Sequence, residues 1–182
     1  MAGGSSWIRS LSSKKILGRG DSGLASMDNM RLIERSWVMI KGWQNSKDGK
    51  TYYAQMTEAF FEYISSLPQC ATDVFASVDG KDDLTNFDEF VLLIKTADEY
   101  AANKSFFRKM RRDPAFQLGK RAFWKGVQVE NLDTIEKGFV SALKFVMCDF
   151  VKTDDKRATI LYAWSSSLRL VMTRMRKAFP HR

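Results

Sequence analysis

The sequence predicts an all-α protein, and three observations support this fold class. From Asp28 onward the apolar residues recur at the three- and four-residue spacing of one α-helical face. No segment of more than a few residues alternates strictly between apolar and polar residues, as a half-buried strand would. Hydrophobic residues make up 45% of the 182 residues, which suffices for one buried core. We therefore expect one bundle of about six to eight helices.

Residues 1–29 are expected to form a disordered N-terminal arm ahead of a domain that spans residues 30–178. The arm holds five glycines and a scatter of serines, and it shows no long apolar period. Its basic residues precede the first acidic residue, Asp21, so a short basic amphipathic helix with a membrane or targeting role is an alternative to a plain tail. Residues 179–182 are expected to be a short C-terminal tail.

The first two helices are predicted from their apolar faces and their ends. The first is expected over about residues 29–42, with Asp28 as its N-cap. The second is expected over about residues 51–67, because Pro68 lacks an amide proton and its ring clashes with a continuing helix. A short turn then leads to Phe75. The inward residues are expected to be Leu32, Ile33, Ser36, Trp37 and Ile40 in the first helix and Tyr53, Met56, Phe60, Phe61 and Ile64 in the second.

A loop and two further helices are expected in the middle of the chain. The stretch 79–83 is acidic and polar, which indicates a loop. It does not follow the ligand spacing of a calcium-binding loop, so no metal site is expected. Helical spacing resumes over residues 84–102. Another helix is expected over residues 114–123, since Pro114 suits a first helical turn.

The last two helices have the clearest periodicity and are expected to pack as an antiparallel pair. A polar turn over residues 152–156 separates them, and Pro180 follows the second. The residues that recur at steps of three and four are Leu132, Ile135, Phe139, Leu143, Val146 and Phe150 in one helix and Ile160, Trp164, Leu168, Val171 and Met175 in the other.

The chain is basic, with a formal net charge of +8. Its densest basic cluster consists of Arg108, Lys109, Arg111 and Arg112. We expect this cluster to bind an anionic partner, with an acidic protein ahead of an anionic membrane surface, and with nucleic acid last because no nucleic-acid motif accompanies the charge. A solvated helix face without a partner is the alternative.

The sequence contains few of the residue combinations that catalysis requires. The only histidine, His181, lies one residue from the end, so neither Cys70 nor Cys148 has a histidine base within the domain. No glycine-rich phosphate loop follows a strand. The two cysteines are expected to be buried thiols in a reducing compartment. No apolar run approaches the ~20 residues that cross a bilayer, so we expect a soluble, cytoplasmic, non-enzymatic protein.

Several landmarks resemble the globin superfamily over about residues 30–178. Ser36 and Trp37 are similar to the first-helix motif of many globins. The pair at 60–61 followed by Pro68 resembles the second globin helix and the proline that opens the third. Phe75 or Val74 resembles the phenylalanine that wedges against haem. The pair Ala163 and Trp164 resembles the Ala-Trp of the last globin helix.

The fourth landmark is the segment that carries the proximal haem ligand in globins of the flavohaemoglobin and plant type. There a basic residue precedes the histidine, and Gly, a branched aliphatic residue, an acid and an aromatic residue follow. The matching residues here are Arg121, Gly126, Val127, Glu130 and Leu132, with Ala122 in place of the histidine. A methyl group has no electron pair to donate to iron.

The resemblance thus implies a globin-like fold without conventional haem ligation. No cofactor is expected, and haem is expected only if a ligand other than histidine holds it. The vestigial pocket is expected to be bordered by Phe60, Phe75, Phe87, Phe90 and Val127, with Phe123 and Trp124 on segments beside it.

We expect a regulatory module of this kind to act without catalysis. A pocket filled by aromatic side chains indicates a scaffold that binds a partner protein, whereas an open pocket indicates a sensor for an apolar ligand such as a fatty acid. A divergent globin that binds haem and gas through a non-histidine ligand is the alternative function.

Overall fold

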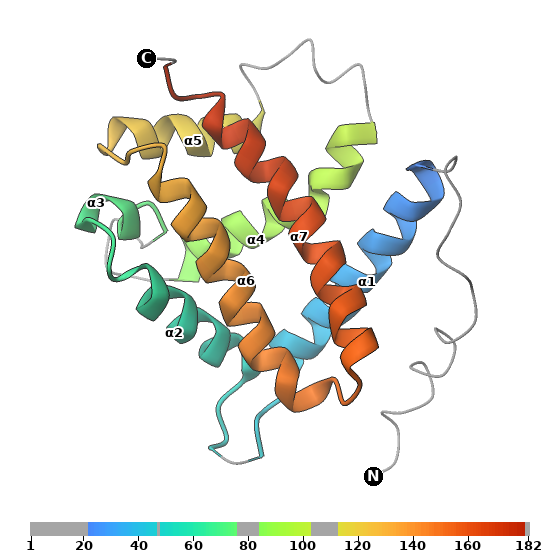
Figure 1. The fold of residues 1–182 in the computed structure, drawn as a ribbon. Helices are drawn as coiled ribbons and strands as arrows, with labels where there is room; N and C mark the ends of the chain where they lie inside the picture. The colour runs from blue at the N-terminus through green and yellow to red at the C-terminus, as the bar shows by residue number, and fades with distance from the viewer. Residues whose placement is uncertain (1–21, 47, 76–83, 103–112, 181–182) are drawn as a thin grey trace.

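The computed structural model describes residues 22–46, 48–75, 84–102 and 113–180. In these ranges the chain forms seven helices and no strand, which confirms the all-α prediction and the expected number of helices (Figure 1). The helices are α1 (Ser22–Gly42), α2 (Tyr52–Ile64), α3 (Gln69–Thr72), α4 (Leu84–Ala102), α5 (Pro114–Trp124), α6 (Asn131–Phe150) and α7 (Asp154–Arg176).

Helix α7 forms the centre of the bundle and packs against α1, α4, α5 and α6. Helices α6 and α7 run antiparallel and are joined by residues 151–153, as the periodicity of both segments predicted (Figure 1). Helix α2 packs mainly against α6, on the far side of α6 from α7 (Figure 1). Four helices therefore pack directly against α7, and α2 joins the bundle mainly through its contact with α6.

Local chemistry sets several helix ends. The Thr51 hydroxyl accepts a hydrogen bond from the amide of Ala54 at 3.1 Å and caps α2. The Asp113 carboxylate accepts one from the amide of Ala115 at 2.9 Å and caps α5, whose first residue is Pro114. Both caps satisfy amides that have no partner inside their own helix.

Three expected boundaries were wrong. Helix α1 begins at Ser22, inside the segment expected to be an arm, so Asp28 lies within the helix and is not its N-cap. Helix α2 ends at Ile64, and a short helix, α3, follows Pro68 where a turn was expected. Helix α7 begins at Asp154, inside the expected polar turn, because acidic residues in a first turn interact favourably with the helix dipole.

Candidate functional site

Phenylalanine rings fill the region where the sequence predicted a vestigial pocket. Phe60 of α2 lies at the centre, with its ring centroid 5.5 Å from that of Phe75 and 5.1 Å from that of Phe87. The centroid of Phe90 on α4 lies 5.0 Å from that of Phe75. All four side chains are fully buried. Rings at these separations are in van der Waals contact, so no ligand can lie between them.

The aromatic packing continues through the bundle to α1. Phe139 of α6 lies 5.6 Å from Phe90 and 5.8 Å from Trp164 of α7, measured between ring centroids. Trp164 in turn lies 6.0 Å from Trp37 of α1. These rings form one connected cluster across α1, α2, α4, α6 and α7, which we call the aromatic core: Trp37, Phe60, Phe75, Phe87, Phe90, Phe139 and Trp164.

Ala122, at the position of the proximal ligand in the resemblance, lies on the buried face of α5. Two contacts of its neighbours fix that helix. The Arg121 guanidinium lies 2.8 Å from the Glu89 carboxylate of α4. The Lys125 ammonium donates to the carbonyl of Asp73 at 2.6 Å, beside Phe75. The inward side chain at this place is therefore a methyl group, which cannot coordinate a metal.

Val127, the remaining expected pocket residue, is buried in the turn after α5. Its amide donates to the carbonyl of Ala122 at 3.1 Å. The structure thus joins Phe60, Phe75, Phe87 and Phe90 through ring contacts, and it places Val127 with Ala122 at the end of α5.

The expected positions of three residues were wrong. Phe123 and Trp124 were expected beside the pocket, but both are exposed, because the buried face of α5 passes through Leu118 and Ala122 and turns the next two residues outward. Cys148 was expected to be buried, but it lies on the exposed face of α6, one residue past the buried Met147.

A buried polar contact links the aromatic core to α1. The indole N–H of Trp164 donates to the hydroxyl of Ser36 at 2.8 Å. The Ser36 hydroxyl lies 2.8 Å from the carbonyl of Leu32 and 2.9 Å from that of Ile33, so it accepts from the indole and donates to its own helix. Sequence reasoning placed Ser36 on the inward face but did not pair it with a residue 128 positions away.

Replacing Ser36 by alanine is expected to lower the free energy of unfolding by about 1–3 kcal/mol, because the buried indole N–H loses its acceptor. Urea denaturation followed by circular dichroism measures this change. Ser65→Ala is the matched control, since the Ser65 hydroxyl also donates to a backbone carbonyl but is exposed and accepts from no buried donor. An equal decrease in the free energy of unfolding of the two variants would contradict the stabilising role assigned to the Ser36–Trp164 hydrogen bond.

Tyr53 of α2 carries a buried hydroxyl with no hydrogen-bond partner among the described residues. Burial raises the pKa of this hydroxyl, and the nearby Asp88 carboxylate raises it further. Lys41 lies 5.1 Å from the centroid of the Tyr53 ring and 5.5 Å from that of Trp37, and its ammonium pairs with Asp88 at 3.2 Å. The charges of Lys41 and Asp88 therefore compensate each other beside the rings of Trp37 and Tyr53.

Replacing Tyr53 by phenylalanine is expected to leave the protein as stable as before or slightly more stable, because the change removes an unpaired buried hydroxyl and keeps the ring. The raised pKa has a second consequence. A group with a raised folded-state pKa contributes stability below its unfolded pKa of about 10 and loses that stability as the pH rises further. Thermal denaturation of Tyr53→Phe and of the parent at pH 7 and above pH 10 checks both effects. Between these pH values the variant should lose less stability than the parent. A variant less stable than the parent by more than about 1 kcal/mol at pH 7 would show that the hydroxyl has a hydrogen-bond partner.

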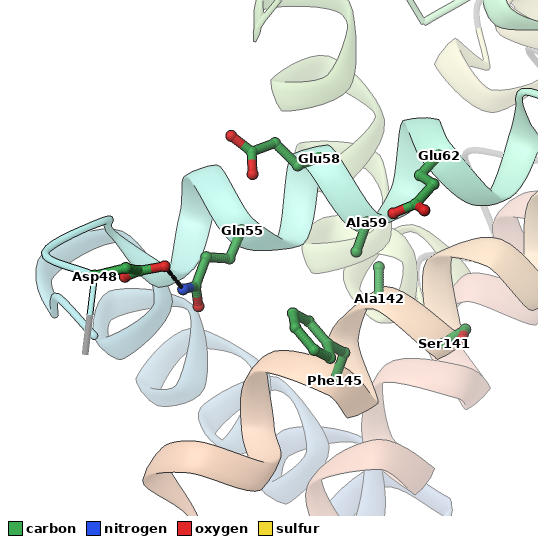
Figure 2. A pocket seen from close by; sticks show the side chains of 8 residues that line it. All are labelled: Asp48, Gln55, Glu58, Ala59, Glu62, Ser141, Ala142 and Phe145. Carbon is green, nitrogen blue, oxygen red and sulfur yellow. Dashed lines mark hydrogen bonds between the residues drawn. The ribbon is translucent and has the colours of Figure 1, made fainter. Parts of the chain in front are cut away.

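A groove of about 360 Å³ lies between α2 and α6 (Figure 2). Its floor contains the small side chains Ala59 and Ala142, and the Phe145 ring projects from α6 toward α2 (Figure 2). Asp48 lies at one end and Glu62 near the other (Figure 2). The groove thus combines apolar surface with negative charge in a basic protein.

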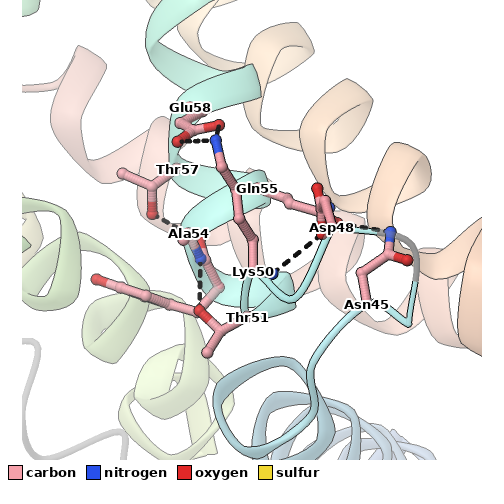
Figure 3. A network of polar contacts seen from close by, with 9 residues as sticks. Asn45, Asp48, Lys50, Thr51, Ala54, Gln55, Thr57 and Glu58 are labelled. Carbon is pink, nitrogen blue, oxygen red and sulfur yellow. Dashed lines mark hydrogen bonds and ion pairs between the residues drawn. The ribbon is translucent and has the colours of Figure 1, made fainter.

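The loop at one end of this groove is held by a polar network (Figure 3). The Asp48 carboxylate accepts from the side-chain amide of Gln55 at 2.7 Å and from the backbone N–H of Lys50 at 3.0 Å, which lowers its pKa. The Lys50 ammonium donates to both carboxylate oxygens of Glu58, at 2.8 and 2.9 Å. Asn45 donates to Asp149 of α6 at 3.0 Å. These bonds position the loop between α1 and α2, and the network contains neither a nucleophile with a base nor a redox group.

Within the described ranges, no cluster of three or more His, Cys, Asp or Glu side chains is placed to hold a metal ion. None of the described helices combines the length and apolarity that a membrane span requires. The expected partner-binding cluster, Arg108, Lys109, Arg111 and Arg112, lies outside the described residues, as do the acidic stretch 79–83 and residues 1–21 of the expected arm.

Comparison with known protein families, with curated proteins and with solved structures finds no match for this chain.

Proposed function

We propose that this protein is a globin-like binding module that works without haem and without catalysis. The packing of the aromatic core supports this proposal most directly. Haem binding in a globin-like fold needs a flat cavity and a donor to iron. Here the buried ring of Phe60 contacts those of Phe75, Phe87 and Phe90, and the residue at the proximal position is Ala122.

The same packing favours a scaffold that binds a partner over a receptor for a fatty acid. Pockets for small apolar molecules are formed in advance as cavities of about 300–1,000 Å³. To make such a space between Phe60, Phe87 and Phe90, the protein would have to separate rings that now contact one another and lose their dispersion energy. The surface, rather than the interior, is therefore where this module is proposed to bind.

Native mass spectrometry of the full chain, purified without added ligands, tests the proposal. We expect the mass of the polypeptide alone, and we expect fatty acids to leave the melting temperature unchanged, because the contacting rings of Phe60, Phe75, Phe87 and Phe90 leave no room for a ligand between them. A retained haem would contradict the proposal and would support the alternative, a globin that binds haem. A retained lipid together with a melting temperature that rises with fatty acid would make the interior a ligand pocket.

A further inference from the structure

The end of α5 and the turn after it expose a group of apolar side chains. Trp124 is 75% exposed, more than any other large hydrophobic residue in the described ranges. Phe123 and Val129 are 39% and 38% exposed. We call these three residues, with the neighbouring Lys120 and Lys125, the α5 tip. Water contact with this much apolar surface is unfavourable, so such a patch marks a site of interaction when it is contiguous.

Packing against the C-terminal end of α7 and the residues after it fixes the position of the α5 tip. The Phe123 ring packs edge-on against Phe179, with centroids 5.8 Å apart, and Phe179 is itself buried. One turn earlier on the same face of α5, Gly119 approaches the backbone of α7 so closely that a Cβ there would lie 2.4 Å from the Met175 carbonyl oxygen. Trp124 therefore projects from a helix whose position is fixed, and a partner that covers it has little ordering entropy to overcome.

The charge around the tip is positive and is carried by lysines. Lys120, Lys125 and Lys177 are all exposed, and Lys177 lies two residues before Phe179. Lys125 donates to the backbone carbonyl of Asp73. Arg121, the one arginine of the segment, pairs with Glu89. Residues 120–130 contain three basic residues and one acid, Glu130, so this segment of the sequence carries a net positive charge.

We propose that the α5 tip docks this protein on an anionic lipid bilayer, with Trp124 and Phe123 in the headgroup boundary and the lysines among the lipid phosphates. An indole suits that boundary because one part of it is apolar and its N–H is polar. Lysine stems lie along apolar surface while their ammonium groups reach anionic headgroups. This proposal concerns the surface alone and does not depend on whether the interior is free of haem.

The composition of the tip favours a bilayer over the two other anionic partners. Protein interfaces are enriched in arginine and depleted in lysine, whereas the cations of the α5 tip are lysines. Single-stranded nucleic acid is bound by aromatic rings that succeed one another along a basic groove. Phe123 instead packs against Trp124 and Phe179 in edge-on contacts, which leaves Trp124 as one projecting ring.

Flotation of the full chain with vesicles tests the proposal. We expect binding to vesicles of phosphatidylcholine with about 30% phosphatidylserine, and little binding to phosphatidylcholine alone or at high salt. Trp124→Ala is expected to weaken binding about tenfold or more. The double variant Lys120→Gln/Lys125→Gln is expected to weaken it about 25-fold, at about fivefold for each lysine.

Matched controls separate the tip from other exposed groups. Tyr162→Ala removes a 69% exposed aromatic residue on α7, and Lys144→Gln/Lys152→Gln removes two exposed lysines elsewhere. Neither control should change binding. Brominated lipids should quench tryptophan fluorescence in the parent chain more than in Trp124→Phe. Circular dichroism of each variant shows that it remains folded.

Three results would overturn the proposal. The first is an absence of binding to any vesicle. The second is binding to anionic vesicles that Trp124→Ala and the lysine variant leave unchanged, which would assign it to other basic segments. The third is tip-dependent binding to a single-stranded oligonucleotide or to an acidic peptide without binding to vesicles, which would assign the tip to nucleic acid or to a protein.

Discussion

Replacement of Gly119 by valine is expected to destabilise the protein by about 3 kcal/mol or more, because α5 and α7 are in backbone contact at this residue. A Cβ atom at position 119 would lie 2.4 Å from the carbonyl oxygen and 2.6 Å from the Cα of Met175. Both atoms belong to the backbone of α7, so no side-chain rotation can relieve the overlap. The two helices would have to separate, which would expose Ala122 and Leu118 on the buried face of α5.

Urea denaturation of Gly119→Val and of a control variant measures this effect. Gly42→Ala is the control, since a Cβ at Gly42 meets no atom within 4 Å. We expect the control to change the free energy of unfolding by less than about 1 kcal/mol. A Gly119→Val variant as stable as the parent would mean that α5 does not contact α7 in this way.

Replacement of Phe60 by alanine is expected to lower the free energy of unfolding by about 3–5 kcal/mol. Phe60 contacts more rings than its neighbours do, since it packs against Phe75, Phe87, Phe90 and Phe139. Removal of the Phe60 ring leaves an apolar cavity that the fully buried rings around it cannot wholly fill. Such an apolar cavity stays dry and accepts a small aromatic molecule.

The variant should therefore gain a property that the parent lacks. Benzene is expected to raise the melting temperature of Phe60→Ala and to leave that of the parent unchanged. Phe145→Ala is the control, because Phe145 is an exposed residue of the α2–α6 groove. A loss below about 1 kcal/mol in Phe60→Ala, or a benzene effect already present in the parent, would show that the interior contains space.

The helical boundaries were predictable where capping residues stand in the sequence. Pro114 predicted the start of α5, which the structure confirms, and the structure adds Asp113 as the N-cap. The start of α1 was missed because Ser22 and Gly23 suggest a tail and the following residues show no clear apolar period. Where the sequence carries no capping signal, tertiary context decides the length of a helix.

The composition of the aromatic core was predictable, but the orientation of α5 was assigned wrongly. Phe123 and Trp124 were placed beside the pocket because aromatic residues are usually buried. The helical period could have shown the opposite, since Leu118 and Ala122 lie four apart and define the inward face. The pair of Ser36 and Trp164 had no signal in the sequence, because only the packing of α1 against α7 brings them together.

The central proposal is that this protein is a globin-like module in which aromatic side chains fill the described core and Ala122 offers iron no ligand at the proximal position. Titration of the full chain with haemin, followed by absorbance, tests it most directly, with an apo-globin that has a proximal histidine as the positive control. We expect the positive control to give a sharp Soret band at one equivalent, and this protein to give only the broad band of unliganded haemin. A sharp Soret band at near-stoichiometric haemin, retained in a variant without the last residues around His181, would contradict the claim.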